Sequence, residues 1–97
     1  MVKHIVTFKL KGSESERLDA SRRFKEALMA LPSVIPCLKS MEVGINMNPS
    51  ESWDVVLTAT IDTMQNVDTY ARHPAHVAAA GIIAPYKESR ACVDYEI

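Results

Sequence analysis

The stretch Trp53-Asp54-Val55-Val56-Leu57-Thr58-Ala59-Thr60-Ile61 decides the fold, because both of its faces suit burial. One face carries a continuous apolar row of alternate residues: Trp53, Val55, Leu57, Ala59 and Ile61. The other face, with Val56, Thr58 and Thr60, favours a strand and is only weakly polar. The alternation predicts a strand over about residues 53–61 that is covered on both sides.

Strand patterns also precede and follow this segment. Residues 2–10 alternate, and their strongly apolar face is made of Val2, His4, Val6, Phe8 and Leu10. Residues 38–47 alternate again, with an apolar set of Met41, Val43, Ile45 and Met47. Asn48-Pro49-Ser50 then predicts a hairpin turn. A last strand is expected over about residues 90–97.

Two segments have helical periodicity. In the first, apolar residues recur at helical spacing at Ala20, Phe24, Ala27, Leu28 and Leu31. Ser13 or Ser15 can cap this helix, and Pro32 ends it. A second helix is expected over residues 62–71, with one or two further helical turns over residues 77–84 after a proline break.

The order of these elements is βαββαβ, which predicts an α+β fold with four antiparallel strands. Both helical segments should cover one face of the sheet. We expect the row from Trp53 to Ile61 to lie on the other face, where it would leave a large apolar patch in water. The chain is therefore predicted to form a homodimer in which two sheet faces pack together and bury Trp53, Val55, Leu57 and Ile61.

The composition limits the class of partner. The 97 residues support one domain, 1–97, and 11 basic against 12 acidic residues give a formal net charge of -1. This balance gives no reason to expect nucleic acid or a membrane as a partner. The strand pattern begins at Val2 without an apolar leader, so cytoplasmic residence is the expected default. Cys37 and Cys92 are isolated thiols that we expect to be reduced packing residues.

The most informative stretch for chemistry is Tyr70-Ala71-Arg72-His73-Pro74-Ala75-His76. Its imidazoles and phenol have ordinary pKa values of about 6.5 and about 10, which suits them to exchange protons. Positions six apart do not share a face of an unbroken helix. Pro74 disfavours helical backbone at His73 and opens a new helix, which lets His76 turn back toward Tyr70. The stretch predicts an acid–base site without naming a substrate.

Several short segments together resemble a known family. They are Val2-Lys3-His4-Ile5-Val6-Thr7-Phe8-Lys9, Ile35-Pro36, Gly44, Tyr70-x-x-His73-Pro74-x-His76 and Asp94-Tyr95. In their order and spacing, the chain is similar to the stress-responsive α/β-barrel (Dabb) domain family of the dimeric α+β barrel superfamily. The resemblance implies a ferredoxin-like protomer, a homodimeric α/β barrel, and a small cavity between sheet and helices. Most such proteins have no assigned reaction, and plant members are stress-associated. One branch is a polyketide cyclase that closes an aromatic ring by aldol condensation without a metal or cofactor.

The resemblance also implies roles for particular residues. The tyrosine, the second histidine and the N-terminal histidine of the cyclase branch correspond to Tyr70, His76 and His4. His76 would be the general base that removes a proton alpha to a carbonyl, and Tyr70 would hydrogen-bond the developing enolate oxygen. The substrate pocket would be lined by His4, Val6, Phe8, Phe24, Leu28 and His73. A cyclase histidine is replaced by Asp54, and the pocket is less aromatic, so we expect a different substrate.

Each of these residues also has a structural interpretation. His76 can bond a carbonyl and fasten the loop, Tyr70 can pack in the core with its hydroxyl satisfied, and His4 can be a satisfied core histidine. His73 can cap the following helix or face solvent. No metal or cofactor is expected, because a His4/His76 pair lacks further ligands and Asp54 should lie at the opposite end of the sheet.

Three functions of different class follow from these features. The first is a cofactorless lyase, cyclase or isomerase that acts on a small apolar or aromatic carbonyl compound. The second is a non-catalytic stress-related or ligand-binding module. The third, with the least support, is a monooxygenase-like or haem-degrading relative, since no oxygen-activating group can be identified in the sequence.

Overall fold

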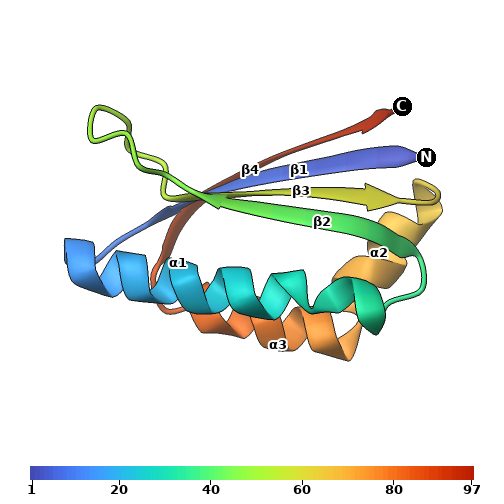
Figure 1. The fold of residues 1–97 in the computed structure, drawn as a ribbon, viewed down its shortest axis with the longest axis horizontal. Coiled ribbons are helices and arrows are strands. Elements are labelled where there is room, and N and C mark those ends of the chain that lie inside the picture. The colour runs from blue at the N-terminus through green and yellow to red at the C-terminus, as the bar shows by residue number, and fades with distance from the viewer.

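The computed structural model describes residues 1–97 as a four-stranded antiparallel sheet with all of its helices on one side (Figure 1). The elements follow in the order β1 (Val2–Leu10), α1 (Glu14–Met29), β2 (Leu38–Ile45), β3 (Val55–Ile61), α2 (Gln65–Arg72), α3 (Pro74–Ile83) and β4 (Lys87–Glu96). The strand order across the sheet is β2-β3-β1-β4. The predicted α+β, ferredoxin-like βαββαβ protomer is therefore confirmed, with its second helix divided into α2 and α3.

The register of the sheet determines which side chains face the helices. In β1, Val6 lies opposite Leu57 of β3 and Cys92 of β4, so these three residues share one face. Val6 and Leu57 are buried in the core with side chains of α1, including Phe24 and Leu28. The helix-covered face is thus built from the alternate residues of β1 that begin at Val2.

The prediction that the row of β3 forms a dimer face is wrong. Val55, Leu57, Ala59 and Ile61 are all buried in the core beneath the helices, and Trp53 lies before the strand rather than in it. The physical reason is the register of β1 against β3, in which Val6 lies opposite Leu57, so that the two most apolar rows lie on the same side of the sheet. The helices cover that side.

The outer face of the sheet is therefore the side with the threonine-rich row of β3. It carries the remaining residues of β1, β3 and β4, which are Lys3, Ile5, Thr7, Lys9, Val56, Thr58, Thr60, Ser89, Ala91, Val93 and Tyr95. Ile5 is flanked by Thr58 and Val93, so apolar groups cross the middle of this face. Two apolar residues of this face lie on the edge strand β4 and are well exposed, Val93 to 61% and Tyr95 to 46%.

The first helix begins and ends as expected. The hydroxyl of Ser13 accepts a hydrogen bond from the Glu16 backbone N–H, and the Glu16 carboxylate accepts one from the Ser13 N–H, which completes a capping box. The helix ends at Met29, and Pro32 lies in a short 3-10 turn, Leu31–Ser33. None of the helices is both long and apolar enough to span a membrane.

The second strand is shorter than its apolar alternation suggested. It ends at Ile45, and Met47 lies in the following loop with 94% of its surface exposed. The amide of Asn46 bonds the backbone of Asn48 and Glu51, so a local polar turn replaces further strand pairing. This loop projects from the sheet as an arm on the side away from the helices (Figure 1).

Candidate functional site

The break between α2 and α3 forms as Pro74 predicts. His73 has extended backbone, with φ -61° and ψ 134°, and Pro74 is the first residue of α3. The Nδ1 atom of His73 accepts a hydrogen bond of 3.1 Å from the Ala75 N–H. His73, predicted to contribute to the substrate pocket, therefore caps α3, as its structural interpretation proposed.

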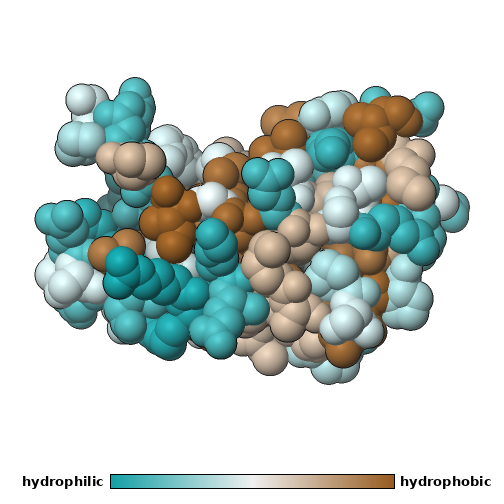
Figure 2. Space-filling view, in the orientation of Figure 1, coloured by the Kyte–Doolittle hydropathy of each residue, from teal (hydrophilic) through white to brown (hydrophobic).

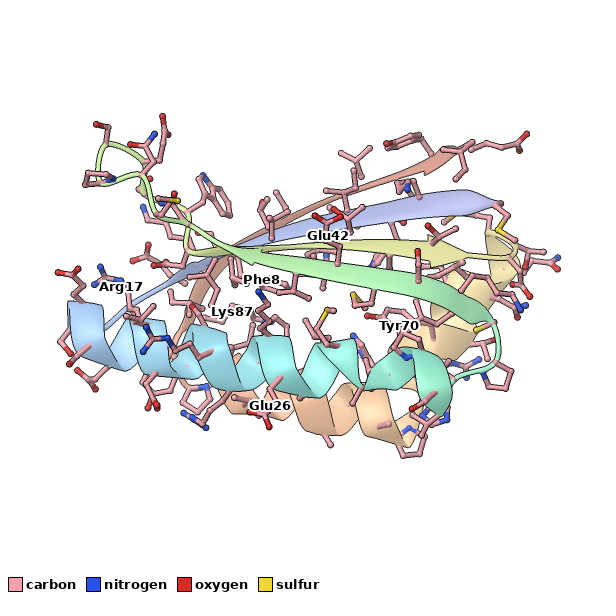
Figure 3. The ribbon with its side chains drawn as sticks, in the orientation of Figure 1. Phe8, Arg17, Glu26, Glu42, Tyr70 and Lys87 are labelled. Atoms are coloured by element: carbon pink, nitrogen blue, oxygen red, sulfur yellow. The ribbon has the colours of Figure 1, made fainter.

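The turn at His73 brings three aromatic rings together between the sheet and the helices. The ring centroids of Tyr70 and His76 lie 4.5 Å apart, and those of His4 and Tyr70 lie 5.7 Å apart with the rings edge to face. His4 reaches this place from β1, on the face shared with Val6. Figure 3 shows Tyr70 in the layer between sheet and helices, near the end of the molecule where α2 lies. The sequence expectation that His76 returns to Tyr70 is met.

The tautomer of His76 is fixed by the end of α2. Its Nδ1 lies 2.9 Å from the carbonyl oxygen of Ala71, which can only accept, so Nδ1–H donates. Burial lowers the pKa of His76 below its ordinary value, and the nearby His4 and Arg90 act in the same direction, while the Ala71 carbonyl opposes them. His76 is therefore a neutral imidazole near pH 7, and its Nε2 lone pair is available to accept a proton.

The hydroxyl of Tyr70 is buried without a hydrogen-bond partner. The side chain is 1% exposed, and its oxygen is the buried side-chain polar atom that no group of the protein satisfies. Burial raises the pKa of Tyr70 well above its ordinary value, so the phenol keeps its proton and can only donate or accept neutral hydrogen bonds. An unsatisfied buried donor beside a neutral imidazole is the most unusual feature of the core.

A second polar group lies against this site, and the sequence interpretation missed it. The His4 Nδ1 atom is 2.5 Å from Oδ1 of Asp94, and the Cys92 sulfur is 3.6 Å from the same nitrogen. Burial and the neighbouring Asp94 raise the pKa of the Cys92 thiol, which keeps it protonated. The available signal was the alternation in the last strand, because Cys92 and Asp94 share a face there.

The apolar residues predicted to line the pocket form the adjoining core. Val6, Phe24 and Leu28 are almost completely buried, and the rings of Phe8 and Phe24 meet edge to face with centroids 5.3 Å apart. Figure 3 shows Phe8 in the same layer as Tyr70. These side chains pack against one another, so the role of this region as a ligand pocket stays a prediction.

Two surface hollows lie elsewhere. One, of about 740 Å³, is polar and lies where the β2–β3 loop meets the start of α1, beside Arg17 and Asp54. The carboxylate of Asp54 accepts hydrogen bonds from the Leu10 N–H at 2.7 Å and from Arg17 Nε at 3.2 Å. The other hollow, of about 600 Å³, lies beside Trp53 on the outer face. Figure 2 shows mainly hydrophilic side chains on the projecting loop and hydrophobic ones below it. Because its carboxylate bonds Leu10 and Arg17, Asp54 has a structural role at the end of β1 opposite His4.

Comparison with known proteins agrees with this architecture. The family model described as the stress-responsive A/B barrel domain (Dabb) matches residues 2–97. The chain belongs to this family. It is 25% identical over 97 residues to olivetolic acid cyclase from Cannabis sativa, and the match covers 97% of this chain and 94% of the cyclase.

Two solved structures illustrate the relationship. A dimeric protein of unknown function with a ferredoxin-like fold from Bacteroides fragilis is 51% identical, with a TM-score of 0.96 over 99% of this chain and 95% of the other. A dimeric ferredoxin-like protein of unknown function from Thermobifida fusca is 28% identical, with a TM-score of 0.82 over 99% of this chain and 90% of the other. These similarities support the fold of the Dabb domain strongly and leave its chemistry to the site itself.

Proposed function

We propose that this Dabb domain performs cofactorless acid–base chemistry, of the lyase, cyclase or isomerase type, on a small apolar or aromatic carbonyl compound. The observation that carries the proposal is the buried, unpartnered hydroxyl of Tyr70 beside the neutral imidazole of His76. A carbonyl oxygen is a suitable partner for that hydroxyl. The similarity to olivetolic acid cyclase adds support, because it extends over nearly the whole chain.

In the proposed reaction, His76 acts as the general base. Its Nδ1–H is held by Ala71, so Nε2 takes a proton from the carbon next to the substrate carbonyl. The electron pair left on that carbon moves into the carbonyl, and negative charge develops on its oxygen. Tyr70 donates its hydrogen bond to this oxygen, where the stabilisation is strongest as the charge grows. The protonated His76 then returns the proton to the product.

Proton exchange at carbon tests this proposal without knowledge of the natural substrate. A small aryl methyl ketone such as acetophenone, in deuterated buffer, should exchange its methyl protons faster with the protein than without it, as followed by proton NMR. A positioned base is worth about 10²–10⁴ in rate, so His76→Ala should remove nearly all of the acceleration. Tyr70→Phe should lower the turnover rate more than it weakens binding.

The matched control is His73→Asn, which removes the other imidazole of the segment and keeps a side chain able to cap α3. It should exchange at the wild-type rate. Equal exchange by wild type and His76→Ala, once corrected for the folded fraction, would reject the catalytic proposal for this class of ketone.

A non-catalytic ligand-binding or stress-related module is the second candidate. The observation that favours it is the packing of the core, since the apolar residues Val6, Phe24 and Leu28 are almost completely buried in the same cluster as Tyr70. His76 also fastens the end of α2 through Ala71, as its structural interpretation proposed. In this case His76→Ala should lower the melting temperature and leave ketone exchange at the level of the buffer, as for wild type.

We also propose that the protein is a homodimer formed through the outer face of the sheet. The structurally similar proteins from Bacteroides fragilis and Thermobifida fusca are dimeric, and the former is 51% identical to this chain. Ile5, Val56, Val93 and Tyr95 leave an apolar surface on this face that no element of the chain covers. A two-fold contact between two such faces buries both at once.

A further inference from the structure

The register of the central strands brings three possible metal ligands to one place. His4 of β1 lies directly opposite Asp94 of β4, and Cys92 lies two residues before Asp94, on the same side of the strand. All three side chains therefore point toward the helices, at the end of the sheet near Tyr70. Two paired strands hold them, so their positions are set by backbone hydrogen bonds rather than by a loop.

The distances within this group suit a single ion. The Cys92 sulfur lies 3.6 Å from His4 Nδ1 and 3.7 Å from Asp94 Oδ2. Two ligands of a tetrahedral zinc ion, one nitrogen or oxygen and one sulfur, are separated by about 3.5 Å, given the usual metal–ligand bond lengths. His4 Nδ1 and Asp94 Oδ1, at 2.5 Å, are closer than the separation of about 3.3 Å that tetrahedral geometry requires. Rotation of the Asp94 carboxylate can lengthen this distance, because either of its two oxygens can bind the metal.

The donor types narrow the choice of metal. An imidazole, a thiolate and a carboxylate form a mixed set that suits Zn²⁺, whereas Mg²⁺ and Ca²⁺ require oxygen ligands. The two anionic ligands balance the charge of a divalent ion. Arg90 lies near Cys92 and opposes the binding of a cation, but it is exposed and its charge is screened by solvent.

We propose that His4, Cys92 and Asp94 form a Zn²⁺ site with three protein ligands and an open fourth position. On binding, the Cys92 thiol releases its proton to solvent and the sulfur takes the metal. Nδ1 of His4 loses the proton that it donates to Asp94, so that the ring binds the metal through Nδ1 as the neutral Nε2–H tautomer. The ring of Tyr70 packs edge to face against His4, with centroids 5.7 Å apart, so the metal site adjoins the Tyr70–His76 pair. The site does not depend on the proposed carbonyl chemistry.

Cobalt is the probe for this site, because a thiolate bound to Co²⁺ gives a charge-transfer band in the near ultraviolet. Metal-free protein titrated with Co²⁺ should develop this band, and added Zn²⁺ should remove it by displacing the cobalt. Cys92→Ser should abolish the band and weaken Zn²⁺ binding by more than about 100-fold. This loss is larger than the loss expected when a residue that only hydrogen-bonds a metal ligand is removed. Asp94→Asn should weaken binding and keep the band.

Cys37→Ser is the matched control, since Cys37 is the other free cysteine and bonds only the Asn66 carbonyl. It should keep both the cobalt band and the affinity for Zn²⁺. Alkylation followed by mass spectrometry gives a second measurement on the wild-type protein, in which Zn²⁺ should protect Cys92 and leave Cys37 as reactive as before. Absence of the band in wild type, a band that survives in Cys92→Ser, or no protection of Cys92 would each overturn the proposal.

Discussion

At the scale of single residues, Tyr70 carries a cost that core packing alone does not explain. A buried hydroxyl without a partner loses its hydrogen bonds to water and gains none in return, which costs about 1–3 kcal/mol. A phenylalanine would fill the same space without this cost. The hydroxyl is therefore better explained by a hydrogen bond to a bound ligand than by a contribution to the stability of the fold.

Replacement of Tyr70 by phenylalanine should accordingly stabilise the protein. Because the variant no longer buries an unsatisfied hydroxyl, we expect its free energy of unfolding in urea to rise by about 1 kcal/mol. The catalytic proposal requires that the same variant lose activity. A fall of about 1 kcal/mol instead would show that the hydroxyl has a partner in solution, such as a bound water.

The half-buried His76 should make the stability of the fold depend on pH in a defined direction. Its pKa in the folded protein is lowered by burial, so the unfolded chain, with an ordinary pKa of about 6.5, binds the proton more readily. The stabilising contribution is complete above the unfolded pKa and is lost as pH falls through the lower, folded pKa.

His76→Gln isolates this contribution, because the amide can still donate to Ala71 but does not take up a proton. The unfolding free energy of wild type, measured relative to this variant, should decrease as the pH is lowered from about 7 to about 5. A constant difference over this range would contradict the lowered pKa of His76.

One of these contacts could be predicted from the sequence and the other could not. Tyr70 and His76 were identifiable because a proline lies between them, and a proline has a local effect on the backbone that can be foreseen. The contact between His4 and Asp94 joins residues 90 positions apart. It depends on the register of β1 against β4, which no local pattern specifies.

At the scale of the elements, the break between α2 and α3 is the feature that positions His76. Two local devices make it, the fixed backbone of Pro74 and the side chain of His73 that accepts from Ala75. Both are encoded in neighbouring residues, and for this reason the break was predictable. The side of β3 that turns toward the helices could not be predicted in this way. Both rows of β3 are suited to burial, and the register of β3 against β1 decides which row is covered.

Loss of the cap at His73 should weaken this break. His73→Ala removes the acceptor for the Ala75 N–H, and we expect the free energy of unfolding to fall by about 0.5–1 kcal/mol, the lower range for lost caps. His73→Asn should restore most of it, since asparagine is a favoured cap. Urea denaturation of the three proteins measures both effects. If the asparagine variant is no more stable than the alanine variant, the imidazole is needed for something other than capping.

At the scale of the whole molecule, the two faces of the sheet have opposite roles. The inner face is closed by α1 and α3, while the outer face presents Ile5 and Val93 beside threonines and has no cover within the chain. Glu42, labelled in Figure 3, lies on this outer side at the edge strand β2. An apolar centre with polar edges is the usual composition of a protein interface.

A pair of substitutions on opposite faces tests the proposed homodimer. Val93→Asp places a charge on the outer face, on the edge strand β4 beside Ile5, where it is harmless in a monomer but costly in a dimer, so we expect a folded monomer. Leu57→Asp places the same charge in the closed core, 2% exposed, and should prevent folding altogether. Light scattering gives the mass of each variant, and circular dichroism shows whether it is folded. A folded Val93→Asp dimer would place the interface elsewhere, whereas a folded Leu57→Asp monomer would mean that the row of β3 faces a second copy after all.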